Sequence, residues 1–247
     1  MEPNLTYLVC ATHRSGSSLF CQSLWHTGLC GYPQEFFSPT QAEKISKEHE
    51  LGVDPAADFP GYVKKLITAR QSPNGVFGGK VMWAHLDPLK EQLNVESETD
   101  LIARLRDLLP NLQFFWAQRD DKVRQAISLW KAKQTNIYNS LQIGKRESPD
   151  TPPEYDFEGI RKIRDRFEGE DANWAAFFER NGIQPHEVHY EDFAPQHEEA
   201  TLAVLRDLDI SIPDDFEMLP LTYRKQSDAL NDTWYERFKS DEAAISA

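Results

Sequence analysis

A serine-rich segment at residues 11–18, A-T-H-R-S-G-S-S, carries side chains suited to binding an anion. Arg14 supplies a permanent positive charge, and Gly16 lets the backbone approach a ligand closely. Hydroxyl donors come from Ser15, Ser17 and Ser18. The segment lies between an apolar stretch and a helical pattern, and helix N-termini attract anions. From these residues alone, a phosphate-binding loop and an ordinary serine-rich helix cap are equally good interpretations.

The same segment is similar to the nucleotide-binding P-loop, G-x-x-x-x-G-K-[ST]. Gly16 and Ser18 match the second glycine and the hydroxyl residue, whereas Ala11 replaces the first glycine and Ser17 replaces the lysine. The lysine that grips nucleotide phosphates in kinases is therefore missing. A P-loop kinase or nucleoside triphosphatase remains the alternative function, together with a non-catalytic nucleotide-binding protein of the same fold.

A second candidate anion site follows the apolar stretch at 112–117. Arg119 is the first charged residue after it, where many nucleotide hydrolases place an acidic Mg²⁺ ligand. A guanidinium at the carboxyl end of a strand suits a second phosphate, and Ser128 follows on the next predicted helix. Arg119 alone would favour a surface ion pair, but its combination with the first loop favours phosphate. No metal site is predicted.

Alternating strands and helices must bring these two sites together. The patterns predict strands at 5–11, 76–82, 112–117 and 187–190, and helices at about 17–27, 101–109, 121–133, 173–180 and 198–208. This order predicts an α/β fold: a single domain at 1–247 with a mostly parallel central sheet, helices on both faces and a P-loop-like strand–loop–helix. A loop or insertion is expected at 137–172 and a frayed tail at 240–247.

Composition limits the partners and the compartment. A formal net charge of −13 argues against nucleic acid or an anionic membrane, because both require a broad basic face. No apolar run approaches the roughly 20 residues of a membrane span, and the first residues lack a basic signal segment. Cys10, Cys21 and Cys30 fit neither a disulfide framework nor a zinc site. We expect a cytoplasmic protein with reduced thiols and no stable membrane insertion.

Taken together, the two anion sites resemble those of the sulfotransferases. The strand–loop–helix of that family typically reads T-Y-P-K-S-G-T-T-W, and here Arg14 replaces its lysine. The resemblance implies that residues 12–18 hold the 5′-phosphosulfate of 3′-phosphoadenosine 5′-phosphosulfate. It also implies that Arg119 and Ser128 hold the 3′-phosphate, and that Arg224 lies in a late basic segment that closes over it.

The resemblance extends to one bacterial branch, the trehalose 2-sulfotransferase type. Shared segments are P-Q-E-F-F at 33–37 and the stretches at 73–83 and 125–135. Most of the chain is covered except 38–60 and 137–172, where contacts with the acceptor would be expected. The resemblance implies metal-independent, in-line transfer of a sulfuryl group to a hydroxyl of a small acceptor, such as the carbohydrate trehalose. It further implies a homodimer.

A general base should take the proton of the acceptor. In the branch that this chain resembles, the glutamate of P-Q-E-F-F has this role, which falls on Glu35. The apolar flank of Phe36 and Phe37 is expected to raise the pKa of Glu35 toward a useful value. The residues alone fit a surface glutamate equally well, and His13 is the rival base. Arg14 is expected to stabilise charge on the leaving phosphate.

Contacts with the acceptor are predicted for Glu35, Phe37, Lys80 and Trp83. Lys80 can stabilise the sulfuryl oxygens or pair with a carboxylate, and the sequence does not decide between these roles. The aromatic side chains of Phe36, Phe37, Trp83 and Trp130 can line an acceptor or adenine pocket, although aromatic residues more often form the core. The histidines at 85, 186 and 189 are expected to be structural or exposed.

Overall fold

The core of the fold is a sheet of four parallel strands in the order β2-β1-β3-β4. The computed structural model describes residues 3–138, 151–222 and 228–246. Its strands are β1 (Leu5–Ala11), β2 (Val76–Met82), β3 (Leu112–Gln118) and β4 (His186–His189). All four predicted strands are confirmed. Apolar residues run almost continuously through β1 and β2 because both faces of this parallel sheet are covered.

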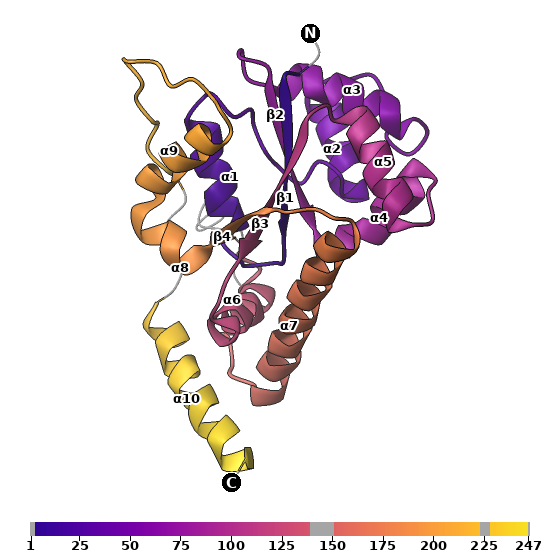
Figure 1. Ribbon diagram of the computed structural model, residues 1–247. Coiled ribbons are helices and arrows are strands. Elements are labelled where there is room, and N and C mark those ends of the chain that lie inside the picture. Colours follow the sequence, from indigo (N-terminus) through magenta and orange to yellow (C-terminus); the bar gives the residue numbers. More distant parts are fainter. Residues whose placement is uncertain (1–2, 139–150, 223–227, 247) are drawn as a thin grey trace.

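Helices cover both faces of the sheet, as predicted (Figure 1). Leu8 and Cys10 of β1 face one core cluster, which is shared with α2 (Pro39–Glu48), α3 (Phe59–Arg70), α4 (Leu86–Leu93) and α5 (Glu98–Leu108). Tyr7 and Val9 face the opposite cluster, which is shared with α1 (Ser17–His26) and α9 (His197–Asp207). Side chains alternate between the two faces of a strand, so one apolar strand supplies both cores.

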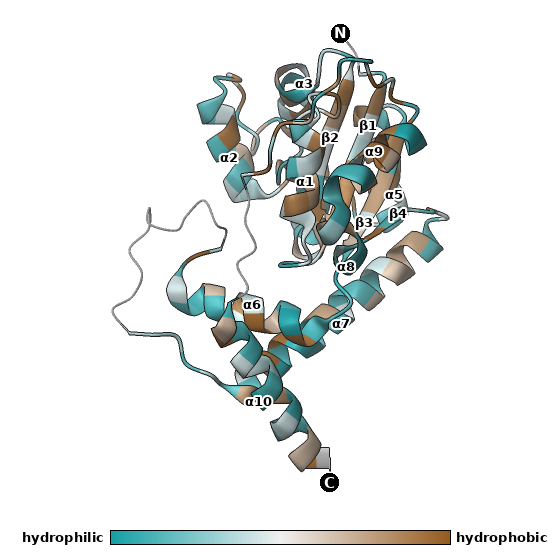
Figure 2. Ribbon diagram, turned by 90° about the vertical axis from the view of Figure 1, so that its left-hand side faces the viewer, coloured by the Kyte–Doolittle hydropathy of each residue, from teal (hydrophilic) through white to brown (hydrophobic). Residues whose placement is uncertain are grey.

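A third apolar cluster lies among α6 (Lys122–Thr135), α7 (Phe157–Arg180) and α10 (Ala229–Ser246). In Figures 1 and 2 these helices lie at one end of the sheet, and α10 extends away from it to the C-terminus. Two predictions were wrong here. Residues 157–172 are the first part of α7 rather than loop, because an apolar stripe packs them against α6. Residues 240–246 continue α10 rather than fraying, because Phe238 and a Glu242–Arg164 ion pair dock that helix.

The sequence patterns gave no helix at 39–48 or 59–70, where the structure has α2 and α3. Both start after a polar residue with proline in the first turn, a common beginning for a helix. At α3 the Asp58 carboxylate accepts a hydrogen bond from the Gly61 N–H at 2.9 Å. These capping signals were present in the sequence.

Within the described residues there are also three short elements: η1 (Trp83–His85), α8 (Tyr190–Phe193) and η3 (Ala194–Gln196). Each follows the carboxyl end of a strand or continues the turn after it. In the part of the chain described, no helix has both the length and the apolar composition needed to cross a membrane. The three cysteines are buried and unpaired, as expected.

Candidate active site

The segment at 12–18 forms a tight loop after β1 and the first two residues of α1. Two of its residues have left-handed backbone conformations, Arg14 with φ 65 and Gly16 with φ 90. The Gly16 carbonyl accepts hydrogen bonds from the N–H groups of Leu19 and Phe20, so α1 begins immediately after it. The first backbone N–H groups of a helix lack an acceptor inside it, so the start of α1 is suited to an anion. The structure therefore has the strand–loop–helix geometry that the sequence predicted.

Arg14 joins the two predicted anion sites. Its Nε donates a hydrogen bond to the Oγ of Ser128 on α6, at 2.9 Å. Its Nη1 donates to the carbonyl oxygen of Tyr138. Burial, reinforced by the nearby positive charge of Arg119, lowers the pKa of Arg14 to about 10. Arg14 is still charged at neutral pH, but two guanidinium groups repel each other here, and an anion between them would relieve that repulsion.

Arg119 lies just beyond the end of β3, next to the start of α8. Its guanidinium stacks over the Tyr190 ring at 4.8 Å, and its Nε is 3.8 Å from a carboxylate oxygen of Glu191. Within the described residues, that buried Nε has no hydrogen-bond partner. Burial lowers the pKa of Arg119, although Tyr190 and Glu191 oppose the shift. A buried, incompletely satisfied guanidinium is suited to a phosphate oxygen.

A cavity of about 960 Å³ opens over the carboxyl ends of the strands. This is where ligands bind in open α/β sheets. It is lined by most of the predicted phosphate ligands, namely Arg14, Gly16, Ser17, Ser18, Arg119 and Ser128, and by the rival bases His13 and Glu35. Ser15 is the exception: its side chain is buried, does not line the cavity, and has no hydrogen-bond partner within the described residues.

Glu35 and Lys80 form an ion pair at one end of this cavity. The Lys80 Nζ is 2.9 Å from Glu35 Oε1 and 3.2 Å from the hydroxyl of Ser18, so it connects the predicted base to the phosphate loop. Lys80 projects from β2 and is almost fully buried, whereas about a third of the Glu35 side chain is exposed. The structure thus shows Lys80 paired with a carboxylate, where the predicted base meets the phosphate loop.

The predicted rise in the pKa of Glu35 was wrong. Burial does favour the neutral acid, but Lys80, His85 and His13 together outweigh it, and the pKa of Glu35 lies below its ordinary value. Burial lowers the pKa of His13 and of His85, while Glu35 opposes both shifts. Both histidines are therefore predominantly neutral at pH 7. His85, at the end of η1, lowers the pKa of Glu35 only when its own imidazole is protonated, a role that the sequence did not suggest.

The aromatic residues predicted for the acceptor pocket belong mainly to the core. Phe36 and Phe37 are fully buried in the first core cluster, and Phe37 packs on Phe59. Trp83 is partly buried against Trp174, with ring centroids 5.1 Å apart. Trp130 packs in the third cluster and donates its N–H to the Glu154 carbonyl. None of these four side chains lines the cavity described above.

Two further expectations concern segments rather than single residues. No residue of 38–60 lines the cavity, and α2 and α3 instead bury Ala42 and Phe59 in the core. Tyr138, within 137–172, does line it.

Arg224 lies outside the described residues. His186 stacks on Phe115, and His189 pairs with Asp120, in keeping with structural roles.

Tyr190 is a site residue that the sequence patterns missed. It follows β4 directly, and its ring lies close to both Gly16 and the guanidinium of Arg119. The signal was its place at the carboxyl end of a parallel strand, the same position that Arg14 and Arg119 occupy after β1 and β3. Arg124, one turn before Ser128 on α6, also lines the cavity and pairs with Asp232 at 2.6 Å.

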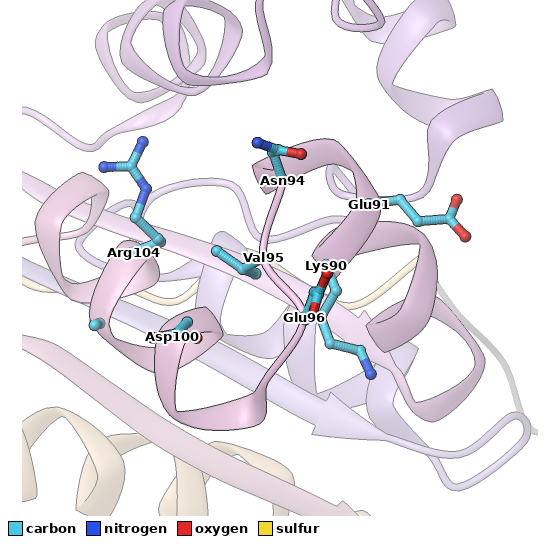
Figure 3. Close-up of a pocket in the computed structure, with 8 residues that line it drawn as sticks. Lys90, Glu91, Asn94, Val95, Glu96, Asp100 and Arg104 are labelled. Atoms are coloured by element: carbon cyan, nitrogen blue, oxygen red, sulfur yellow. The ribbon is translucent and has the colours of Figure 1, made fainter.

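A separate surface hollow of about 560 Å³ lies between α4 and α5 (Figure 3). It is lined by Lys90, Glu91, Asn94, Val95, Glu96, Asp100, Ala103 and Arg104. In Figure 3 the charged ends of Glu91 and Arg104 point away from each other. None of the residues predicted to do chemistry lies there, so the cavity over the strand ends is the candidate active site.

The chain is similar to several known proteins. The trehalose 2-sulfotransferase of Mycobacterium tuberculosis is 30% identical over 259 residues, covering 95% of this chain and 94% of its own. That of Mycolicibacterium smegmatis is 29% identical over 262 residues, with the same coverage. A sulfotransferase domain from the curacin biosynthetic pathway matches with a TM-score of 0.46 and 13% identity, covering 86% of this chain and 76% of its own. A sulfotransferase from Alicyclobacillus acidocaldarius gives 0.45 and 12%, covering 98% and 94%.

The Stf0 sulphotransferase family profile matches residues 6–241, from the second residue of β1 into α10. The match includes the loop after β1, the end of β3 and the Glu35–Lys80 pair. Because it spans nearly the whole chain, this protein belongs to the Stf0 sulphotransferase family.

Proposed function

We propose that this protein transfers a sulfuryl group from 3′-phosphoadenosine 5′-phosphosulfate to a hydroxyl group of a small carbohydrate. The observation that carries the proposal is that two buried guanidinium groups, Arg14 and Arg119, face one cavity, in which burial and the charge of Arg119 lower the pKa of Arg14. A donor that carries one phosphate at the 3′ position and another at the 5′ position of its ribose would pair with both guanidinium groups. The 5′-phosphosulfate would bind the loop after β1, and the 3′-phosphate would bind Arg119 and Ser128.

The reaction moves one group between two oxygens. The acceptor oxygen forms a bond to sulfur while the bond from sulfur to the bridging phosphate oxygen breaks, which releases adenosine 3′,5′-bisphosphate. Arg14 and the N–H groups of the loop stabilise the negative charge that develops on the leaving phosphate. Positioning and electrostatics supply most of the rate enhancement, as in phosphoryl transfer.

Glu35 is proposed to take the proton of the acceptor hydroxyl. Its low pKa keeps it ionised and ready to accept a proton over the whole neutral range. Lys80 contacts both Glu35 and the Ser18 hydroxyl, and its ammonium is proposed to contact the sulfuryl oxygens as they move from donor to acceptor. This bridging position favours a catalytic role for Lys80 in addition to its ion pair.

Trehalose is the first acceptor to test, because the two curated relatives are trehalose 2-sulfotransferases. The protein is incubated with sulfur-labelled donor and either trehalose, other disaccharides or monosaccharides, and the labelled product is identified by mass. Preferential labelling of trehalose supports the proposal in full. Labelling of another sugar changes the acceptor only, and no labelling of any hydroxyl compound contradicts the proposal.

The two alternatives make different predictions. A P-loop kinase or nucleoside triphosphatase is stabilised against heat by ATP with Mg²⁺, whereas the proposed enzyme is stabilised by adenosine 3′,5′-bisphosphate. A non-catalytic binder shows the second behaviour without turnover. The proposal also includes a homodimer and a cytoplasmic location; sedimentation of the purified protein and fractionation of cells test these two predictions.

A further inference from the structure

Gln125 holds the phosphate loop from outside the cavity. It lies on α6, three residues before Ser128, and its side chain is fully buried. Its Nε2 donates hydrogen bonds to the hydroxyl of Thr12 at 2.8 Å and to the carbonyl oxygen of His13 at 2.7 Å. Gln125 does not line the cavity, whereas Ser128 does. One helix therefore presents a hydroxyl to the cavity and an amide to the loop.

The hydrogen bond to the His13 carbonyl also orients the next amide. In a trans peptide, the C=O of one residue and the N–H of the following residue point in opposite directions. Holding the His13 carbonyl toward Gln125 thus directs the Arg14 N–H away from Gln125. Arg14 has φ 65, a left-handed conformation that a residue with a side chain rarely adopts. Such a conformation persists only where the surrounding structure holds it.

Two other side chains also donate hydrogen bonds to the neighbouring backbone. The Trp174 indole on α7 donates to the carbonyl oxygen of Ala11, at 3.1 Å. Lys122 donates to the carbonyl oxygen of Arg119 and pairs with Asp171 of α7. The loop after β1 and the end of β3 are therefore both fixed by side chains of α6 and α7. Of these contacts, the two from Gln125 reach the loop itself.

We propose that Gln125 is a positioning residue that keeps the loop in its anion-binding conformation and so controls affinity for the 5′-phosphosulfate end of the donor. The inference rests on the proposed function, which supplies the ligand of the loop. It predicts a selective effect, because the position of the Arg119 guanidinium does not depend on the hydrogen bond between Gln125 and the His13 carbonyl. Loss of the Gln125 amide should therefore weaken 5′-phosphorylated ligands and spare those that carry only a 3′-phosphate.

The test compares two partial ligands, adenosine 5′-phosphosulfate and adenosine 3′-phosphate, by calorimetry. Gln125→Met keeps the length of the side chain and removes both donors. We expect about tenfold or greater weakening of adenosine 5′-phosphosulfate and less than about threefold weakening of adenosine 3′-phosphate. In steady-state assays the donor KM should rise while the acceptor KM stays unchanged. Val123→Ala is the matched control, since Val123 is buried on the same helix within the third core cluster.

Val123→Ala should lower the thermal stability without changing the ratio of the two affinities. Equal weakening of both ligands by Gln125→Met, or no weakening, overturns the inference. If that variant does not fold, Gln125→Leu also removes both amide donors and must show the same selective loss. Failure of the wild-type protein to bind either ligand, or adenosine 3′,5′-bisphosphate, contradicts the proposed function instead, so the two failures are distinguishable.

Discussion

Lys80 and Glu35 are joined by an ion pair of 2.9 Å between Nζ and Oε1, at the point where the phosphate loop approaches the predicted base. The two residues are far apart in sequence and meet because β2 lies beside β1 and the segment after α1 returns to the sheet. The backbone N–H of Lys80 also donates a hydrogen bond to the Gln34 carbonyl, which fixes that returning segment. Predictions about the base must therefore treat Glu35 and Lys80 as a unit.

Replacing Glu35 tests the base directly. Glu35→Gln keeps the shape of the side chain but cannot accept the proton of the acceptor. We expect turnover to fall by about 10²–10⁴-fold, with donor affinity nearly unchanged. Steady-state rates and calorimetric donor binding on the same preparation measure the two effects. Turnover close to that of the wild type would reject Glu35 as the base, and His13 would be the next candidate.

Replacing Lys80 tests the cause of the low pKa of Glu35. A base works only when ionised, so the rate falls as the pH drops through its pKa. In the wild type this acidic limb should lie below the ordinary pH range of glutamate titration, because the pKa of Glu35 is lowered. Lys80→Met removes the main opposing charge and leaves burial to raise the pKa, so the limb should move to higher pH. Lys80→Arg keeps the charge and should keep the limb low. An unmoved limb in Lys80→Met would contradict this account.

Replacing Arg119 tests the 3′-phosphate site. Arg119→Ala should weaken adenosine 3′,5′-bisphosphate by roughly 1.5–3 kcal/mol, the worth of a hydrogen bond to a charged group. Adenosine 5′-phosphosulfate lacks the 3′-phosphate and should lose much less. Calorimetry with both ligands measures the difference, and the second ligand serves as the internal control. Equal losses for the two would remove Arg119 from the 3′-phosphate site.

Gly16 and Gly28 provide a matched pair for the loop geometry. Both have left-handed φ values, but a Cβ on Gly16 would lie 2.4 Å from Tyr190 Cδ2, whereas a Cβ on Gly28 would meet nothing within 4 Å. Gly28→Ala should lower the free energy of unfolding by about 1 kcal/mol, and Gly16→Ala by clearly more. Gly16→Ala alone should also weaken donor binding. Denaturant titration measures the free energy of unfolding of both variants. Equal destabilisation by the two substitutions would show that Tyr190 moves aside readily.

Metal removal separates the proposed reaction from that of a kinase. A sulfuryl group carries less negative charge than a γ-phosphate, and Arg119 follows β3 where many nucleotide hydrolases have an acidic Mg²⁺ ligand. We therefore expect full activity in EDTA, measured as transfer of labelled sulfur to the acceptor. Activity lost in EDTA and restored by Mg²⁺ would favour the kinase alternative.

The sequence by itself determined the local elements that position the chemistry. The apolar run of β1, the glycine of the loop and the serines that follow it predict a strand, a turn and a helix N-terminus, because each depends on neighbouring residues. Family motifs then indicated sulfuryl transfer. The start of α7 and the end of α10 could not be predicted, because packing against distant parts of the chain stabilises those helices. In the third cluster, α7 packs against Ile127 of α6 and Trp234 of α10.

Only the tertiary structure decided which side chains face the ligand. Phe37 and Glu35 are two residues apart, yet one is in the core and the other lines the cavity. The pKa of Glu35 depends on Lys80, which reaches it from another strand, so the apolar neighbours in sequence predicted the wrong direction. Tyr190 and Gln125 likewise act on the loop from elements far along the chain. Burial and electrostatics are set by distance in space, which the order of residues does not contain.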